Sequence, residues 1–231
     1  MADKKTDELK NEAVKTANDA KDSVSKADFK TEAKKTSNFV FELFRDPISS
    51  IEGVVTDKKN TKFITAIIIF AVWLLFIFIN SFQGIGALGW GYFWTQVFET
   101  FKSIFKNLLS PIIGVAALSL ILFLYPKKGK TKITLTSIIT LVIIVATPIV
   151  CCEVLDLLRY FRFLHPAKFL NTIGLIATLL SGVLSYFAFK SITGEDDDKK
   201  AIRNFMVIQG IYFIVYFVLS LNFIGIYLPI L

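Results

Sequence analysis

Five long apolar runs separated by short polar segments organise most of the chain. They cover about residues 63–80, 108–125, 135–152, 169–189 and 205–224. Each is 18 to 21 residues long, close to the ~20 residues that a helix needs to cross a hydrocarbon core about 30 Å thick. Because every backbone polar group in lipid must be paired, runs of this length predict helices. The sequence therefore predicts an all-α membrane protein, a five-transmembrane-helix bundle.

The composition supports this class. Hydrophobic residues make up 54% of the chain and charged residues only 19%, whereas soluble domains carry about 25% charged residues. This composition excludes an ordinary soluble domain, and we expect the lipid bilayer to be a partner. The formal net charge of +7 comes mainly from lysines in short loops beside the runs. It therefore indicates membrane orientation, and we expect no nucleic-acid partner.

Basic residues cluster in three of the segments that flank the runs. Short loops rich in Lys and Arg stay on the cytoplasmic side of a membrane. With five spans, these three segments lie on the same side of the membrane. This arrangement predicts a cytoplasmic N-terminus and an extracytoplasmic C-terminus, and we expect the protein to lie in the cell membrane. The basic residues are Lys58, Lys59 and Lys62 before the first run, four lysines within 127–132, and Lys190, Lys199, Lys200 and Arg203 before the fifth run.

The chain divides into two parts. Residues 1–36 are polar and contain too few large apolar residues to form a packed core. We expect this part to be a cytoplasmic tail, either disordered or helical at the membrane surface. It has no apolar stretch typical of a signal peptide, so we expect the N-terminus to be retained. Residues 37–231 form the membrane domain.

Two short amphipathic helices are predicted within 38–55, just before the first run. Apolar residues recur at helical spacing from Phe39 to Phe44. Asp46 then suits the N-cap of a second helix and Pro47 suits its first position. Amphipathic helices beside a span lie in the headgroup interface or dock against the bundle. The sequence leaves both placements open.

The longest loop between runs, residues 81–106, carries an aromatic cluster suited to the membrane interface. Its members are Trp90, Tyr92, Phe93 and Trp94. From Phe93 onward, apolar residues three and four positions apart mark one helical face. This pattern predicts an interfacial helix that leads into the second span.

Small residues form a stripe on the fourth run. Gly174, Thr178 and Gly182 lie four positions apart on one helical face, and small residues at this spacing let helix backbones approach closely. We predict a helix-packing face there. It acts either inside the bundle, with this helix at the centre, or between copies of the chain or with another membrane protein.

A polar cluster follows Pro148 at the end of the third run. It consists of Glu153, Asp156, Arg159 and Arg162. Pro148 lacks a backbone donor and is expected to kink the helix. The three-residue spacing of the cluster allows local ion pairs. An ion or proton site is the alternative, because ionisable residues in a membrane are costly.

Signatures of catalysis or metal binding are absent from the sequence. The two cysteines, Cys151 and Cys152, are adjacent within an apolar run, and the single histidine, His165, lies in the loop that follows. They do not make a zinc site, and we expect them to be packing residues. We therefore expect a non-enzymatic protein without cofactor or metal.

Several segments together resemble the Yip1-domain family, in particular its bacterial members. They are Phe41–Ile51 before the first span, the lysine-rich hairpin after the second, Thr147–Val150 in the third, and Phe189–Gly194 with Lys199–Ala201 before the fifth. The resemblance covers about residues 38–228. It implies a five-helix bundle with a cytosolic N-terminus. The Asp-Leu-Tyr-Gly-Pro signature of eukaryotic members is absent, so the resemblance implies no role in binding Rab GTPases.

Two functions fit these features. The first is a non-enzymatic membrane protein that acts through association with protein or lipid, as in membrane organisation or trafficking. The small-residue stripe and the amphipathic helices favour it. The alternative is a small transporter or channel, which Pro148 and the acidic pair Glu153 and Asp156 favour.

Overall fold

The computed structural model describes residues 14, 18, 29–57, 61–82, 93–125, 133–160 and 167–223. Within these ranges all regular structure is helical. The elements in chain order are α2 (Phe29–Arg45), α3 (Pro47–Val55), α4 (Lys62–Asn80), α5 (Phe93–Leu124), α6 (Leu135–Val145), α7 (Thr147–Leu155), the 3-10 helix η2 (Asp156–Tyr160), α8 (Ala167–Thr193) and α9 (Asp198–Phe223). The predicted all-α class is confirmed.

The predicted spans correspond to these helices one by one. In the described ranges, α4, α5, α8 and α9 are each long and apolar enough to cross a membrane. The helices α6 and α7 meet the same test as a pair, with a bend of 42° between them. The protein is therefore a multi-pass membrane protein whose third span is broken.

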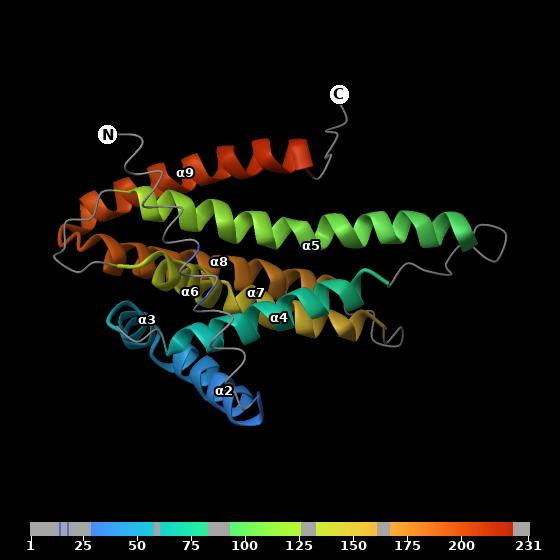
Figure 1. Cartoon of the computed structure of the whole chain (residues 1–231), viewed down its shortest axis with the longest axis horizontal. Coiled ribbons are helices and arrows are strands. Elements are labelled where there is room, and N and C mark those ends of the chain that lie inside the picture. The colour runs from blue at the N-terminus through green and yellow to red at the C-terminus, as the bar shows by residue number, and fades with distance from the viewer. Residues whose placement is uncertain are drawn as a thin grey trace.

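The spanning helices form two layers (Figure 1). α5 and α9 pack together in one layer, and α4, α6, α7 and α8 form the other. Successive spans run in opposite directions, which brings the start of α4 and the α8–α9 hairpin to the same end (Figure 1). Among described residues, this end carries Lys62, Lys190, Lys199, Lys200 and Arg203, and also the acidic residues Glu195 and Asp196–Asp198 of the same hairpin. We call it the basic end after its Lys and Arg residues, which are the ones that the positive-inside rule counts, and the opposite end the far end.

The centre of the bundle is α6. Every residue of this helix except Ile139 is buried, and Ile138, Leu141 and Ile144 are 0% exposed. The helices α3, α4, α5 and α8 all contact α6, so neighbours cover it on nearly every side. The sequence favoured the fourth run as the central helix. Instead α8 keeps an outward face, on which Leu179 is 63% exposed.

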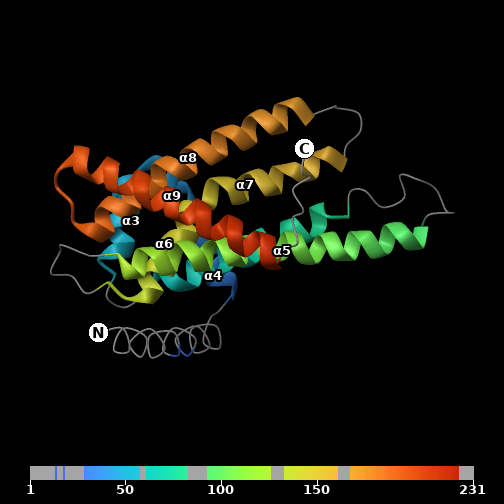
Figure 2. The same cartoon turned by 90° about the horizontal axis from the view of Figure 1, so that it is seen from above.

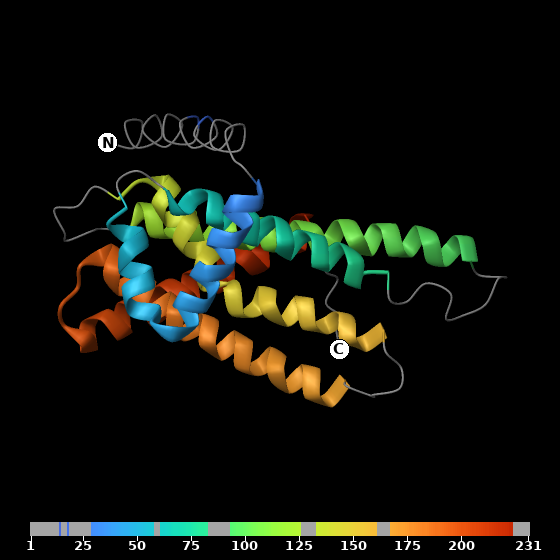
Figure 3. The same cartoon turned by 90° about the horizontal axis from the view of Figure 1, so that it is seen from below.

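The helices α2 and α3 dock against the basic end of the bundle, and run across the direction of the spans (Figure 3). Phe39 and Leu43 of α2 and Ile51 and Val54 of α3 are buried in the common core. The Lys62 ammonium lies 4.7 Å from the centre of the Phe39 ring, a cation–π contact that joins α2 to α4. Of the two placements that the sequence left open, docking is the one observed.

Two details of this region refine the sequence predictions. α2 begins at Phe29, within the segment predicted as a polar tail. The Glu32–Lys35 ion pair, at 2.6 Å, lies in this early part of the helix. The predicted cap at Asp46 is confirmed, since its carboxylate accepts the Ser49 backbone N–H at 3.2 Å and Pro47 starts α3.

The segment predicted as an interfacial helix leading into the second span forms one continuous helix with it. α5 has 32 residues, which corresponds to about 48 Å at 1.5 Å per residue. Its first turns therefore project past the far end of α4 (Figure 2). Pro111 lies inside α5 without ending it. Trp90 and Tyr92 of the predicted aromatic cluster lie outside the described residues.

The outer surface of the bundle is apolar. Large hydrophobic side chains of α8 and α9 face outward, including Phe213 at 68% exposed and Leu175 at 63% exposed. In water such a surface would associate or aggregate, whereas in a bilayer it contacts lipid tails. The helices therefore associate with the lipid bilayer, as the sequence predicted.

Candidate functional site

A break in the third span shapes the candidate site. α6 ends at Val145, and α7 begins at Thr147 with Pro148 in its first turn. A proline is tolerated in the first turn because the N–H that it lacks has no partner within the helix. The kink predicted at Pro148 is confirmed, and it takes the form of two helices that meet at 42°.

Backbone groups at the break are satisfied locally. The Ala146 N–H donates to the Ile143 carbonyl at 3.2 Å, and the Thr147 hydroxyl donates to the Ile144 carbonyl at 2.6 Å. Thr147 is only 1% exposed. Pro148 cannot supply the N–H that a continuous helix would direct to Ile144. The hydroxyl of the preceding residue therefore contributes a donor where the proline removes one.

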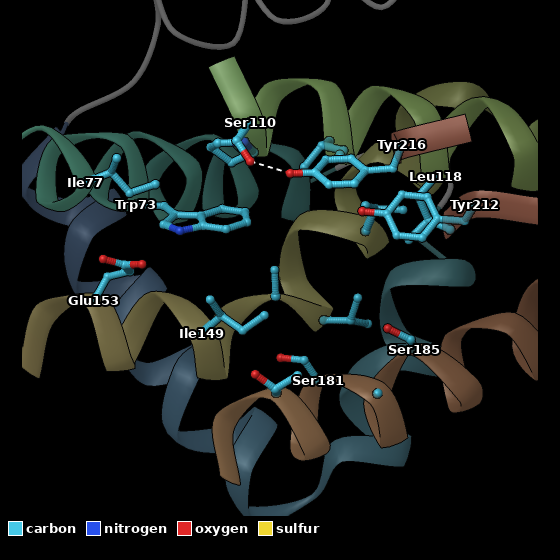
Figure 4. A pocket seen from close by; sticks show the side chains of 18 of the residues that line it. Trp73, Ile77, Ser110, Leu118, Ile149, Glu153, Ser181, Ser185, Tyr212 and Tyr216 are labelled. Carbon is cyan, nitrogen blue, oxygen red and sulfur yellow. Dashed lines mark hydrogen bonds between the residues drawn. The ribbon is translucent and has the colours of Figure 1, made fainter. Parts of the chain in front are cut away.

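A cavity of about 770 Å³ lies beside the break, between the two layers (Figure 4). Its volume is in the range of small-molecule and cofactor sites, about 300–1,000 Å³. All five spans contribute to its wall, with Trp73 of α4, Gly114 of α5, Val145 of α6 and Ile149 of α7 in the broken third span, Ser181 of α8 and Tyr212 of α9 among the lining residues. The wall is mainly apolar with several hydroxyl groups.

One side of the cavity is formed where α5 and α9 meet. The hydroxyls of Ser110 and Tyr216 share a hydrogen bond (Figure 4). A Cβ added at Gly114 would lie 3.1 Å from the Tyr212 hydroxyl oxygen, so the glycine is what allows this tyrosine to approach α5. These contacts fix two tyrosine rings at the cavity wall.

The opposite sides of the cavity carry two polar atoms without a partner. Within the described part of the chain, Trp73 Nε1 and Ser181 Oγ are buried and make no hydrogen bond. The two side chains lie on opposite sides of the open space (Figure 4). Most buried polar groups in proteins are paired, so these two atoms are exceptions among the residues that line the cavity.

The far end of the cavity is polar. Asn80 Nδ2 donates to the Glu153 carbonyl at 2.9 Å and to its carboxylate at 3.2 Å. Asn107 Nδ2 donates to the Ser81 hydroxyl at 3.2 Å. Asp156 also lines this end. The cavity thus has an apolar, hydroxyl-bearing interior and a carboxylate-bearing far end.

The predicted polar cluster is only partly described. Glu153 and Asp156 both line the cavity, whereas the side chain of Arg159 and all of Arg162 lie outside the described residues. One partner of Glu153 is Asn80 on another helix, which local spacing could not reveal. Among the described residues, no three His, Cys, Asp or Glu side chains are grouped to hold a metal ion.

The small-residue stripe of α8 borders the same cavity. Thr178 and Gly182 line it, and the Thr178 hydroxyl donates to the Gly174 carbonyl at 2.9 Å. A Cβ at Gly174 would lie 3.7 Å from Cys152 Sγ, whereas one at Gly182 would meet nothing within 4 Å. Within one chain Gly182 therefore faces open space. The role of the stripe in helix packing stays a prediction.

Sequence reasoning missed the contributions of Trp73, Tyr212 and Tyr216. A signal for the last two was present, because Gln209, Tyr212 and Tyr216 recur at three- and four-residue spacing on one face of an apolar helix. Trp73 gave no such signal, since a tryptophan within an apolar run resembles any lipid-facing residue.

Together these observations define a multi-pass α-helical membrane protein with a cavity between its spanning helices. The family model of the Yip1 domain matches residues 41–220, so the chain belongs to the Yip1-domain family. This range lies within the region of the sequence resemblance. Neither the curated proteins nor the solved structures contain a match.

Proposed function

We propose that this protein acts without catalysis, through association with lipid, and that the cavity between the layers receives part of a lipid molecule. The observation that carries the proposal is the cavity of about 770 Å³, whose wall is formed by residues from all five spans. Its interior combines apolar side chains with a few hydroxyls, as in sites for small amphiphilic molecules. A role in membrane organisation or trafficking follows from such binding.

The direct test fills the cavity. Gly182 lines the cavity, and an added Cβ there meets nothing within 4 Å, so the position has room for a side chain beside the cavity and Gly182→Leu is the variant used to fill it. Gly210 on α9 also has open space but does not line the cavity, and Gly210→Leu is the matched control. The protein is purified from membranes in mild detergent, and bound lipid is counted by native mass spectrometry.

We expect lipid on the wild type and on Gly210→Leu, and about tenfold lower occupancy on Gly182→Leu, equivalent to about 1.4 kcal/mol. Lipid-free wild-type protein, or equal occupancy in all three proteins, contradicts the proposal. Cross-linking on the same samples tests the other role of the stripe. A defined partner that is lost only in Gly182→Leu would favour a protein interface at Gly182.

A second candidate function, a small transporter or channel, is favoured by the broken third span. Broken helices with ionisable residues beside a cavity are typical of transporter sites, and Glu153 and Asp156 line the far end here. The test is proton or cation flux into proteoliposomes. Flux that vanishes in Glu153→Gln would favour transport over lipid association.

We also propose where the protein lies and how it is oriented. It is a bacterial member of its family and lies in the cell membrane, with the basic end and the N-terminus on the cytoplasmic side. The described cations Lys62, Lys199 and Arg203 at one end support this orientation under the positive-inside rule. Protease protection of tags on both termini tests it, because five spans require the tags to lie on opposite sides.

A further inference from the structure

The helix α2 has a second apolar side, away from the bundle. Phe39 and Leu43 dock α2 onto the bundle and are 3% and 1% exposed. Residues two positions apart lie about 200° apart around a helix, so Phe41 points away from both of them. Phe41 is 75% exposed, and Phe44, one turn further on, is 49% exposed. The described part of the chain therefore leaves two aromatic rings of α2 uncovered.

Two cations lie on the same side of α2 as these rings. Lys34 is seven positions before Phe41 and Arg45 is four positions after it, so the three side chains share one face of the helix. Lys34 and Arg45 are both exposed. Helices that lie in a membrane surface combine such cations with exposed apolar side chains. We call Lys34, Phe41, Phe44 and Arg45 the outer face of α2.

The contacts of α2 place its outer face at the level of a membrane surface. The Lys62 ammonium lies 4.7 Å from the centre of the Phe39 ring, and Ala66 is buried in the same cluster as Phe39. α2 therefore packs on the first turns of α4, a span that begins at Lys62. The ends of a span lie where headgroups meet hydrocarbon. Since α2 also runs across the direction of the spans (Figure 3), lipid is what surrounds it at this level.

We infer that the outer face of α2 binds anionic glycerophospholipids in the leaflet at the basic end, with Lys34 and Arg45 at the lipid phosphates and the two Phe rings beneath them. Neutral lipid accommodates the rings but offers the cations no net negative charge, so the anionic headgroup is the specific feature. A second copy docked through the same face would bring like charges together. The site is separate from the cavity and does not depend on lipid binding there.

Spin labels test whether the outer face is inserted. In the full-length protein carrying Cys151→Ala and Cys152→Ala, single labels are attached through Phe41→Cys, Phe44→Cys or Glu42→Cys. Glu42 is the matched control, because it is exposed and adjacent to Phe41 but lies about 100° around the helix. In bilayers of phosphatidylcholine and phosphatidylglycerol, paramagnetic resonance measures collisions with oxygen, which concentrates in lipid, and with a water-soluble nickel chelate. We expect oxygen to dominate at 41 and 44, and the chelate to dominate at 42.

Charge variants test the preference for anionic lipid. Native mass spectrometry of the full-length protein compares retention of phosphatidylglycerol with that of phosphatidylcholine with the same chains. We expect Lys34→Gln and Arg45→Gln each to lower the preference for phosphatidylglycerol about fivefold, the effect of one cation near an anionic surface. The matched control is Lys35→Gln, because Lys35 follows Lys34 directly but pairs with Glu32 at 2.6 Å. This variant should keep the wild-type preference.

Each contrary result overturns the inference. Labels at 41 and 44 that meet the nickel chelate as often as the label at 42 would place the outer face in water. Labels shielded from both reagents would show that protein covers the face. An unchanged preference in Lys34→Gln and Arg45→Gln, or an equal loss in Lys35→Gln, would exclude the two cations as its source. None of these results bears on the cavity, which Gly182→Leu tests separately.

Discussion

Asn80, the last residue of α4, donates its amide to both the backbone carbonyl and the carboxylate of Glu153 on α7, at 2.9 and 3.2 Å. The two residues are 73 positions apart in the sequence. Their contact joins the ends of two helices at the far end of the cavity. The Asn80 amide therefore helps to hold α4 and α7 together at this part of the cavity wall.

Replacing this amide should loosen the far end. Asn80→Ala removes two hydrogen bonds, one of them to a carboxylate, and we expect a loss of about 1–2 kcal/mol in stability. Thermal unfolding in detergent measures it. Asn107→Ala is the control, because Asn107 is exposed and bonds at 3.2 and 3.4 Å to nearby hydroxyls. Equal losses of thermal stability in the two variants would show that the Asn80–Glu153 contact stabilises the protein no more than the hydrogen bonds of Asn107 do.

The break in the third span provides a second prediction. Thr147→Val keeps the side-chain shape and removes the hydroxyl that donates to the Ile144 carbonyl, so we expect a loss of about 1 kcal/mol in thermal stability. Thr140→Val is matched, since the buried Thr140 hydroxyl donates to the Thr136 carbonyl at 2.8 Å within a regular helix. That carbonyl keeps its ordinary helical bond, and the variant should lose less. The reverse order would contradict the role assigned to Thr147.

The glycines that border the cavity should differ in tolerance. Gly114→Leu places a side chain against Tyr212, where even a Cβ comes within 3.1 Å of the hydroxyl. We expect it to separate α5 from α9 and to cost about 1–3 kcal/mol, as overpacking does. Gly182→Leu should fold with nearly wild-type thermal stability. A comparable loss in Gly182→Leu would indicate that another chain covers this position.

The cap of α3 should be sensitive to acid. The pKa of Asp46 lies below its ordinary value of 3.8, because the side chain and then the backbone N–H of Ser49 form hydrogen bonds with its carboxylate. The cap therefore contributes stability above the unfolded pKa and loses it as pH falls through the lower folded pKa.

Unfolding of three proteins at about pH 6 and about pH 3 tests this expectation. Asp46→Asn keeps a capping side chain that does not titrate, so its stability should fall less with acid than that of the wild type. Asp46→Ala should be less stable than the wild type at the higher pH. Parallel acid sensitivity in wild type and Asp46→Asn would exclude the cap as its source.

Local features of the sequence predicted much of the fold. The length of the apolar runs predicts the spans, Asp46 and Pro47 predict the start of α3, and Pro148 predicts the break. Each of these depends on neighbouring residues alone, such as a missing N–H or a capping carboxylate. For that reason they could be recognised without knowledge of tertiary contacts.

The cavity could not be predicted in the same way. Trp73 and Ser181 line the cavity from different helices, and Asn80 meets Glu153 across 73 residues. Such pairs depend on how the helices pack, which periodicity does not specify. The position of α6 shows the same limit, because the small residues of the fourth run had made that helix the candidate for the centre. Instead α6 lies at the centre, in contact with α3, α4, α5 and α8.

The most direct test of the central claim is a crystal structure of the protein grown from a lipid mesophase of diacyl lipid. The account predicts elongated density between the two layers, along the apolar part of the cavity wall that includes Leu118, Val145 and Ile149. A cavity filled only with ordered water, or one closed by direct contact between the helices, would contradict it.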